Sequence, residues 1–105
     1  MRRFEIWVVS LDPVVGSEMQ KPRPAVGISP DEMNDRLNTV LVAPLTRRGF
    51  VAPFRVPCQF VGVTGQIALD HVRSVDKRRL ARRLGQLDPA TAKTVLATLR
   101  ELFEE

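Results

Sequence analysis

The sequence contains few of the residues that most often carry enzyme or metal chemistry. It has one cysteine, one histidine and no tyrosine among 105 residues. The single Cys58 cannot form a disulfide within the chain, and no group of cysteines and histidines has the spacing of metal ligands. We therefore expect no metal site and no cofactor. Cys58 itself is typical of a small buried hydrophobic residue, which suits a reducing compartment.

Long hydrophobic runs are also missing. No apolar stretch approaches the roughly 20 residues that a membrane-spanning helix needs. The N-terminus has basic residues before apolar ones, as signal peptides do. However, Glu5, Ser10 and Asp12 interrupt the apolar stretch, and no small-residue cleavage site follows. We therefore expect residues 1–105 to form a single domain with no membrane partner, located in the cytoplasm.

The excess charge is positive. Sixteen lysine and arginine residues against 12 acidic ones give a net charge of +4, and 13 of the 16 are arginines. Since the guanidinium fork matches phosphate oxygens, this balance favours a polyanionic partner, most simply nucleic acid. The alternative is an arginine enrichment that reflects genome composition. The densest run contains Lys77, Arg78, Arg79, Arg82 and Arg83. This run could bind along a nucleic-acid backbone or an acidic peptide. The alternative is that it is a solvated face of the protein.

Runs of β-branched and aromatic residues predict a mainly β protein. The predicted strands cover residues 4–11, 24–29, 39–45, 54–56, the region near Phe60, 66–72 and 81–87. A short helix is predicted to begin with Ser29 as its cap and to end at Leu37, and residues 76–80 have the pattern of a helical turn. Gly27 inside the second strand indicates a bulge or the close approach of another part of the chain.

The end of the chain has the pattern of an amphipathic helix. Asp88 and Pro89 match an N-cap followed by proline at the first helical position. Apolar residues then recur at helical spacing, namely Val95, Leu96, Leu99, Leu102 and Phe103. We expect this helix to pack on the sheet. The predicted fold is therefore a small β-barrel with a C-terminal amphipathic α-helix.

A long polar segment, residues 16–24, separates the first two predicted strands. Loops of this length between paired strands are uncommon unless they bind something. It ends with Arg23 between Pro22 and Pro24, and the residue before each proline is biased toward extended backbone. A stiffened arginine loses less entropy when it binds a phosphate or a carboxylate. The alternative is that Arg23 is only a solvated loop charge.

Other polar residues that could take part in catalysis or binding lie near strand ends. Thr46 follows Pro44 and Leu45, while Gln66, Asp70 and His71 lie on a late strand. A threonine at the end of a strand usually caps a turn, so Thr46 alone carries little weight. A single histidine also excludes a ribonuclease mechanism that needs a histidine pair.

Five short motifs in the same order resemble the MazF/PemK (Kid-like) family of toxins of type II toxin–antitoxin systems. They are Phe4–Val8 followed by Leu11–Pro13, Gly16–Glu18, Arg23–Pro24, Val42–Thr46 and Val72–Leu80. The resemblance implies an SH3-like barrel and a sequence-specific endoribonuclease, an mRNA interferase, that cleaves single-stranded RNA as a homodimer. It also implies a cognate acidic antitoxin as partner, and contact with DNA only through that antitoxin.

Within this resemblance, Arg23 and Thr46 match the family's catalytic arginine and threonine. RNA supplies its own nucleophile, the 2′-hydroxyl, so the expected reaction needs no metal and leaves a 2′,3′-cyclic phosphate and a 5′-hydroxyl. A fixed guanidinium and a hydroxyl donor would stabilise the negative charge that builds on the phosphate oxygens.

Six further residues are predicted to bind the substrate: Glu18, Gln20, Lys21, Arg47, Arg48 and His71. Glu18 is a candidate general base or base reader, or it fixes Arg23 by an ion pair. Two departures from the family pattern stand out, because Phe4 replaces a usual glycine and His71 replaces a usual glutamine. His71 stacks on a base, titrates near neutral pH or makes a structural hydrogen bond. The sequence does not show which RNA bases are recognised.

Two other functions fit the same barrel. A non-enzymatic toxin, such as a gyrase poison, would not need Arg23 and Thr46 together and would depend on C-terminal residues such as Phe103. An SH3-like binding module would have no toxicity.

Overall fold

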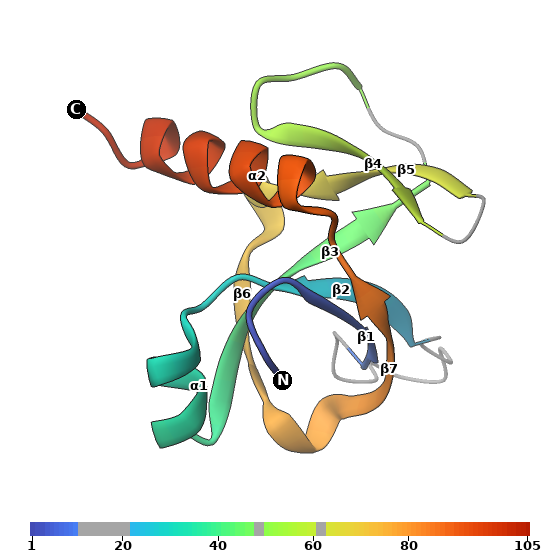
Figure 1. Ribbon diagram of the computed structural model, residues 1–105, viewed down its shortest axis with the longest axis vertical. Helices are drawn as coiled ribbons and strands as arrows, with labels where there is room; N and C mark the ends of the chain where they lie inside the picture. Colours follow the sequence, from blue (N-terminus) through green and yellow to red (C-terminus); the bar gives the residue numbers. More distant parts are fainter. Residues whose placement is uncertain (11–21, 48–49, 61–62) are drawn as a thin grey trace, which may run out of the picture.

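The computed structural model describes residues 1–10, 22–47, 50–60 and 63–105 (Figure 1). Its strands are β1 (Glu5–Val9), β2 (Arg23–Gly27), β3 (Thr39–Thr46), β4 (Arg55–Phe60), β5 (Val63–Ala68), β6 (Arg73–Asp76) and β7 (Leu80–Gln86). The helices are α1 (Asp31–Arg36) and α2 (Pro89–Leu102), with the 3₁₀ turns η1 (Leu69–His71) and η2 (Lys77–Arg79). α1 and α2 lie at opposite ends of the molecule (Figure 1).

The strands form one antiparallel sheet that curls into a half-barrel. Its strand order is β4-β5-β3-β2-β1-β7, with β6 paired to β3 outside this path. β3 is the central strand: Val42 is opposite Gly27 of β2 on one edge and opposite Arg73 of β6 on the other. The prediction of a small, mainly β, SH3-like barrel with a C-terminal helix is confirmed.

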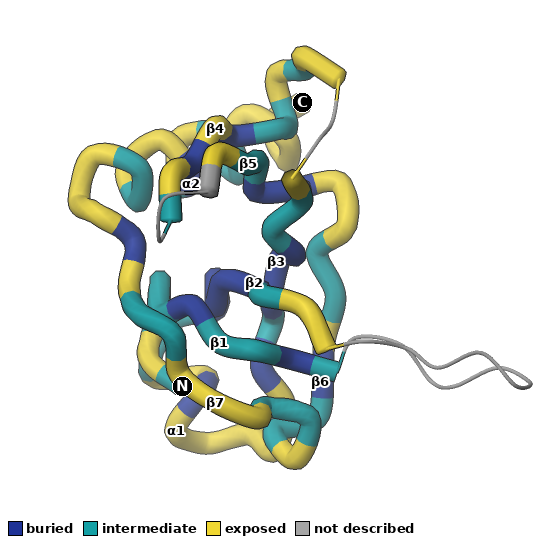
Figure 2. The backbone as a smooth tube through the Cα atoms, turned by 90° about the vertical axis from the view of Figure 1, so that its right-hand side faces the viewer, coloured by how far each residue is buried: buried dark blue, intermediate teal, exposed yellow. Residues whose placement is uncertain are grey.

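Alternation along the strands divides the buried residues into two clusters, because successive side chains point to opposite faces of a sheet. On β3, Ala43 belongs to the cluster that also contains Ile6 and Val95 of α2. Its neighbour Val42 belongs to the cluster on the other face, with Val9, Ala25, Val40 and Val75. Figure 2 shows the buried parts of β1, β2 and β3 in the interior.

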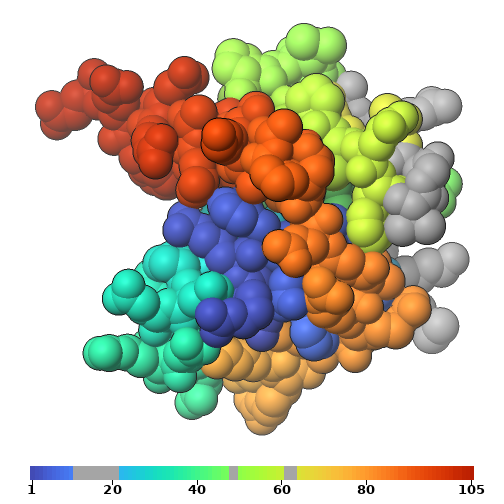
Figure 3. All heavy atoms as spheres, viewed as in Figure 1, coloured from blue at the N-terminus to red at the C-terminus, as the bar shows by residue number. Residues whose placement is uncertain are grey.

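Helix α2 begins as predicted. Asp88 accepts a hydrogen bond from the backbone N–H of Thr91 (3.1 Å), and Pro89 occupies the first turn. Of the apolar residues expected to pack on the sheet, Val95 is fully buried, whereas Leu102 and Phe103 are 43% and 80% exposed. The helix packs on the sheet as predicted, but its last two apolar residues do not, because the helix extends past the sheet (Figures 1 and 3).

Four local predictions also need correction. Ser29 does not cap α1; its hydroxyl donates to Asn34 Oδ1 (2.6 Å) and accepts from the N–H of Leu41 (3.0 Å), and Pro30 occupies the cap position. The two short strands predicted at residues 54–56 and near Phe60 form one continuous strand, β4, which includes Pro57. The predicted strand 66–72 gives way to η1 after Ala68. Residues 73–76, for which no strand was predicted, form β6, because pairing with β3 satisfies their backbone.

The residue that replaces the family's usual glycine has an unusual backbone. Phe4 has φ of 69°, in the left-handed region that favours glycine. Its N–H donates to the carbonyl of Gly27 (2.7 Å), and its own carbonyl accepts from the N–H of Leu87 (3.0 Å). These bonds join the N-terminal segment to β2 and to the residue that follows β7, and they hold the strained conformation.

Core packing at β5 is open to a direct test. Ile67 is fully buried between Leu45 and Val56 of the neighbouring strands. We expect Ile67→Val to lower the free energy of unfolding by about 0.5–1.5 kcal/mol, measured by urea denaturation. The matched control is Val51→Ala at a fully exposed side chain, which should change the value by less than about 0.5 kcal/mol. Equal effects in both variants would contradict the assignment of Ile67 to the core.

Candidate active site

The two predicted catalytic residues lie where β2 and β3 part. The strands pair from Gly27↔Val42 to Ala25↔Pro44. Beyond that pair β3 leaves β2 and turns to β5 (Figure 1). Arg23 and Thr46 each lie two residues past the last pair, so both belong to the face that carries Ala25 and Pro44. Arg23 is exposed, and the described residues give its guanidinium no hydrogen bond or ion pair.

Thr46 has an unusual hydroxyl. Its Oγ1 is buried and makes no hydrogen bond within the described part of the chain. Directly opposite, on β5, is Gln66, whose Oε1 is likewise buried and unpartnered. Buried polar atoms are almost always hydrogen-bonded, and unsatisfied ones destabilise a fold. Two such atoms on facing residues mark this strand end as a place where a polar ligand can be bound.

The backbone of β5 lies in close contact with the backbone of Thr46. A Cβ added to Gly65 would lie 2.5 Å from the carbonyl oxygen of Thr46 and 3.8 Å from the Cα of Arg47. Real Cβ atoms do not approach backbone oxygen this closely, so only glycine fits at this position. β5 therefore fixes the end of β3, and with it the position of the Thr46 hydroxyl.

A polar and aromatic cluster borders this strand end. Gln66 Nε2 donates to the carbonyl of Phe50 (3.2 Å), and the guanidinium of Arg55 lies 4.8 Å from the centre of the Phe50 ring. Arg55 also donates two hydrogen bonds to Asp70, at 2.7 and 2.9 Å. These bonds hold the pKa of the Asp70 carboxyl below its ordinary value. His71, which is 63% exposed, has Nε2 3.4 Å from Asp70 Oδ2.

The Arg55–Asp70 pair predicts a pH dependence of stability. Because the pKa of Asp70 is lower in the folded protein, the pair stabilises the fold above the unfolded pKa of about 4. That stability is lost as the pH falls through the folded pKa. We expect Asp70→Asn to lower the free energy of unfolding at pH 7, and the difference from wild type to shrink below about pH 4. Urea denaturation across pH checks this, and a difference that is independent of pH would contradict it.

The other predicted site residues divide into two groups. Glu18, Gln20, Lys21 and Arg48 lie outside the described residues. Arg47 is exposed and follows Thr46 directly, and His71 is exposed at the end of η1. Gln66 is the residue whose role the sequence did not indicate. Its pairing opposite Thr46 depends on strand register, which no short motif encodes.

Comparisons with known proteins identify the family. Residues 2–103 match the family described as PemK-like, MazF-like toxin of type II toxin–antitoxin system. The chain belongs to this family. Endoribonuclease PemK of Escherichia coli is 36% identical, over 98% of this chain and 82% of the relative. Endoribonuclease MazF9 of Mycobacterium tuberculosis is 37% identical, over 86% of this chain and 85% of the relative.

A solved structure agrees with these relatives. A chain of the crystal structure of MazE–MazF from Deinococcus radiodurans superposes with a TM-score of 0.84 and 28% sequence identity. The match covers 97% of this chain and 94% of that chain. The family predicted from the five motifs is therefore confirmed, both by sequence and by fold, and its curated relatives are named endoribonucleases.

In this PemK/MazF-like chain, the basic run of residues 77–83 is not a uniform patch of unpaired charge. Lys77 Nζ donates to the carbonyl of Asn34. Arg78 pairs with Asp76 (3.0 Å), and Arg83 pairs with Glu5 (2.7 Å). Arg79 donates to the carbonyl of Ser10 (3.4 Å). Much of this positive charge therefore has a structural partner within the fold.

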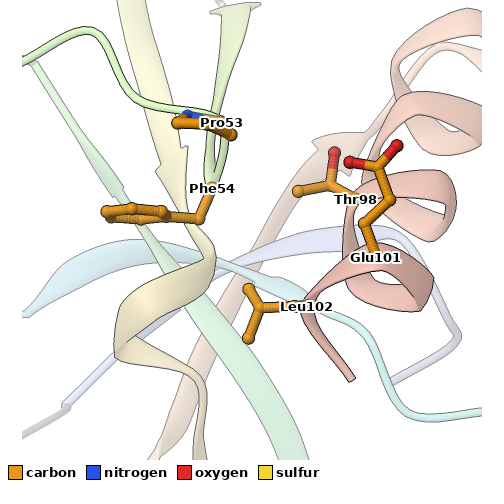
Figure 4. A pocket seen from close by; sticks show the side chains of 5 residues that line it. All are labelled: Pro53, Phe54, Thr98, Glu101 and Leu102. Atoms are coloured by element: carbon orange, nitrogen blue, oxygen red, sulfur yellow. The ribbon is translucent and has the colours of Figure 1, made fainter. Parts of the chain in front are cut away.

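The half-open pocket beside α2 is a separate feature. It has a volume of about 250 Å³ and is lined by Pro53, Phe54, Thr98, Glu101 and Leu102. Figure 4 shows the loop residues facing the three residues of α2 across it. Its lining includes one carboxylate and no cation, which does not suit a phosphate. In the described ranges, no helix is long and apolar enough to cross a membrane, and no group of three potential metal-ligating side chains gathers in one place.

Proposed function

We propose that this protein is a toxin that cuts single-stranded RNA at specific sequences, with Arg23 and Thr46 as its catalytic residues. Membership of the PemK/MazF-like family and relatives named endoribonucleases support the activity. The observation that carries the site is the buried, unpartnered hydroxyl of Thr46 at the strand end that borders Arg23. Such a hydroxyl makes no hydrogen bond that the described part of the fold needs, so a ligand that reaches it can bond to it.

In the proposed reaction, the 2′-oxygen of one nucleotide attacks the adjacent phosphorus. A bond forms between the 2′-oxygen and phosphorus, and the bond from phosphorus to the 5′-oxygen breaks. The 2′-hydroxyl loses its proton to a general base, and the departing 5′-oxygen takes a proton from water. The products are a 2′,3′-cyclic phosphate and a 5′-hydroxyl, and the nucleophile needs no metal for its formation.

The chain contributes charge stabilisation to this reaction. Negative charge builds on the non-bridging phosphate oxygens as the 2′-oxygen attacks. The Arg23 guanidinium, with a pKa above about 12, is a poor proton donor and acts by electrostatic stabilisation. The Thr46 hydroxyl donates a hydrogen bond to the same phosphate. Glu18 is a candidate general base or a reader of an RNA base.

The neighbouring residues would bind the RNA chain. Arg47 is exposed next to Thr46 and, with Arg48, would attract the phosphate that follows. His71 would contact a base, since its ring is largely exposed. Glu18, Gln20 and Lys21 would select the bases. This division assigns affinity to the arginines and sequence preference to the loop.

The proposed partners follow from the family. We propose a homodimer that acts in the cytoplasm and is neutralised by a cognate acidic antitoxin, through which alone it would contact DNA. The solved MazE–MazF structure, 28% identical, supports a protein partner of this kind. Light scattering of the purified protein should give twice the mass of one chain. Co-expression of a small acidic protein encoded beside the toxin gene should restore growth.

The experiment that tests the activity is cleavage of single-stranded RNA by purified protein in EDTA. We expect cuts at a limited set of sites, each with a 5′-hydroxyl end, and mapping those ends gives the recognised sequence. Absence of cleavage, together with growth inhibition that disappears in Phe103→Ala, would instead support a non-enzymatic toxin. Absence of both cleavage and growth inhibition would support a binding module.

A further inference from the structure

Gln66 lies beside the Thr46 hydroxyl, and neither the family motifs nor the comparisons give it a role. The two residues are directly opposite in the β3–β5 pair. Side chains at opposite positions of antiparallel strands leave the same face, with Cβ atoms about 4.5–5.5 Å apart. The amide of Gln66 and the hydroxyl of Thr46 therefore border the same small volume.

The orientation of the Gln66 amide is fixed by one hydrogen bond. Its Nε2 donates to the carbonyl of Phe50 (3.2 Å). Since a carbonyl can only accept, the NH₂ group must face Phe50, and Oε1 is the end left over. Oε1 is buried and has no hydrogen-bond partner in the described part of the chain. The fold therefore leaves this acceptor unsatisfied, and a ligand donor that reaches it would gain binding free energy.

The chemistry of RNA indicates which donor this is. The sugar–phosphate backbone of an internal nucleotide has many acceptors but a single hydrogen-bond donor, the ribose 2′-hydroxyl. That hydroxyl is also the backbone group next to the phosphate that Thr46 would bind. Base amino groups lie farther from the phosphate than the separation of two opposite side chains. An acceptor placed beside a phosphate-binding hydroxyl thus suits the 2′-hydroxyl.

We infer that Gln66 Oε1 accepts a hydrogen bond from the 2′-hydroxyl on the 5′ side of the scissile phosphate. The inference rests on the proposed function. An amide oxygen is too weak a base to remove the proton, so Gln66 orients the attacking hydroxyl and does not act as the general base. It also distinguishes RNA from DNA at this nucleotide.

The test combines one protein change with one change in the RNA. The protein is the Arg23→Ala variant, in which slow cleavage allows binding to be measured. The probes are a synthetic RNA that spans one mapped cleavage point and the same RNA with a single 2′-deoxyribose at the attacking nucleotide. We expect the deoxy change to raise Kd about tenfold. In Arg23→Ala/Gln66→Met, the two probes should bind equally.

Two results would overturn the inference. The first is an increase in Kd, on removal of the 2′-hydroxyl, that is the same in both proteins. The second is an equal Kd for the two probes in Arg23→Ala alone. This measurement needs no Gln66 variant, so it tests the inference even if Gln66→Met does not fold. Methionine is chosen because it has the length of glutamine without the polar atoms.

A kinetic arm separates this inference from the proposed function. Gln66→Met alone should slow RNA cleavage, whereas the control Gln86→Met, at an exposed position of β7, should cleave as fast as wild type. Wild-type protein that does not cut RNA would refute the proposed function itself. Wild-type cleavage with an equal rate in Gln66→Met would refute only the role of Gln66.

Discussion

Arg23→Ala is expected to reduce the rate of RNA cleavage by about 10²–10³-fold. The guanidinium is exposed at the start of β2 and has no partner among the described residues, so its removal leaves the folded protein nearly unchanged. The loss would come from the transition state, where negative charge on the phosphate is greatest. Single-turnover cleavage of a mapped RNA measures it, with thermal unfolding as the check on the fold.

The control for this prediction is another exposed arginine. Arg100 lies on α2, and Arg100→Ala removes the same charge away from the strand end. Its cleavage rate should stay close to that of wild type. Arg23→Lys is informative as well, because lysine keeps the charge but loses the planar fork that binds two phosphate oxygens. Equal losses in Arg23→Ala and Arg100→Ala would mean that only net charge matters, and would contradict a catalytic role for Arg23.

Thr46→Val is expected to lower cleavage by a similar factor, about 10²–10³-fold, without loss of stability. Its hydroxyl is buried and has no hydrogen-bond partner among the described residues, so the folded protein already carries the cost of desolvating it. Valine keeps the β-branched shape that suits a strand and removes that cost. The free energy of unfolding should therefore equal or exceed the wild-type value. A residue needed for structure would show the opposite, with lost stability accompanying lost activity.

Thr39→Val is the matched control for this variant. Thr39 is on the same strand, at its other end, and is exposed. The exchange there should leave both cleavage and stability unchanged. If Thr46→Val were to keep full activity, the assignment of Thr46 to the phosphate would be wrong, whatever the outcome at Arg23.

The sequence determined the family and most of the fold. Runs of β-branched and aromatic residues located most of the strands, and the Asp88–Pro89 pair located the start of α2, since both depend on residues close in the chain. The structural predictions that were wrong have physical causes. Ser29 has the sequence of a helix cap, but its hydroxyl is used by Asn34 and Leu41 in a buried network. Residues 73–76 become a strand only because β3 offers them an edge.

The candidate site divides in the same way. Arg23 and Thr46 could be predicted because each lies in a short local motif that resembles the family. Gln66 could be noted only as a polar residue on a late strand. Its position opposite Thr46 could not be predicted, because it is a property of strand register between segments 20 residues apart. The unsatisfied hydroxyl of Thr46 is likewise invisible in a sequence, since burial and the absence of a partner are set by the surrounding structure.

The scarcity of histidine, cysteine and tyrosine thus determined what kind of chemistry the chain could perform. A chain with one histidine, one cysteine and no tyrosine is suited to a substrate that supplies its own nucleophile. The tertiary structure alone decided where that chemistry can occur. Only the curl of the sheet separates β3 from β2 and pairs it with β5, and that change of partner brings Thr46 next to Gln66 with two buried polar atoms left unsatisfied.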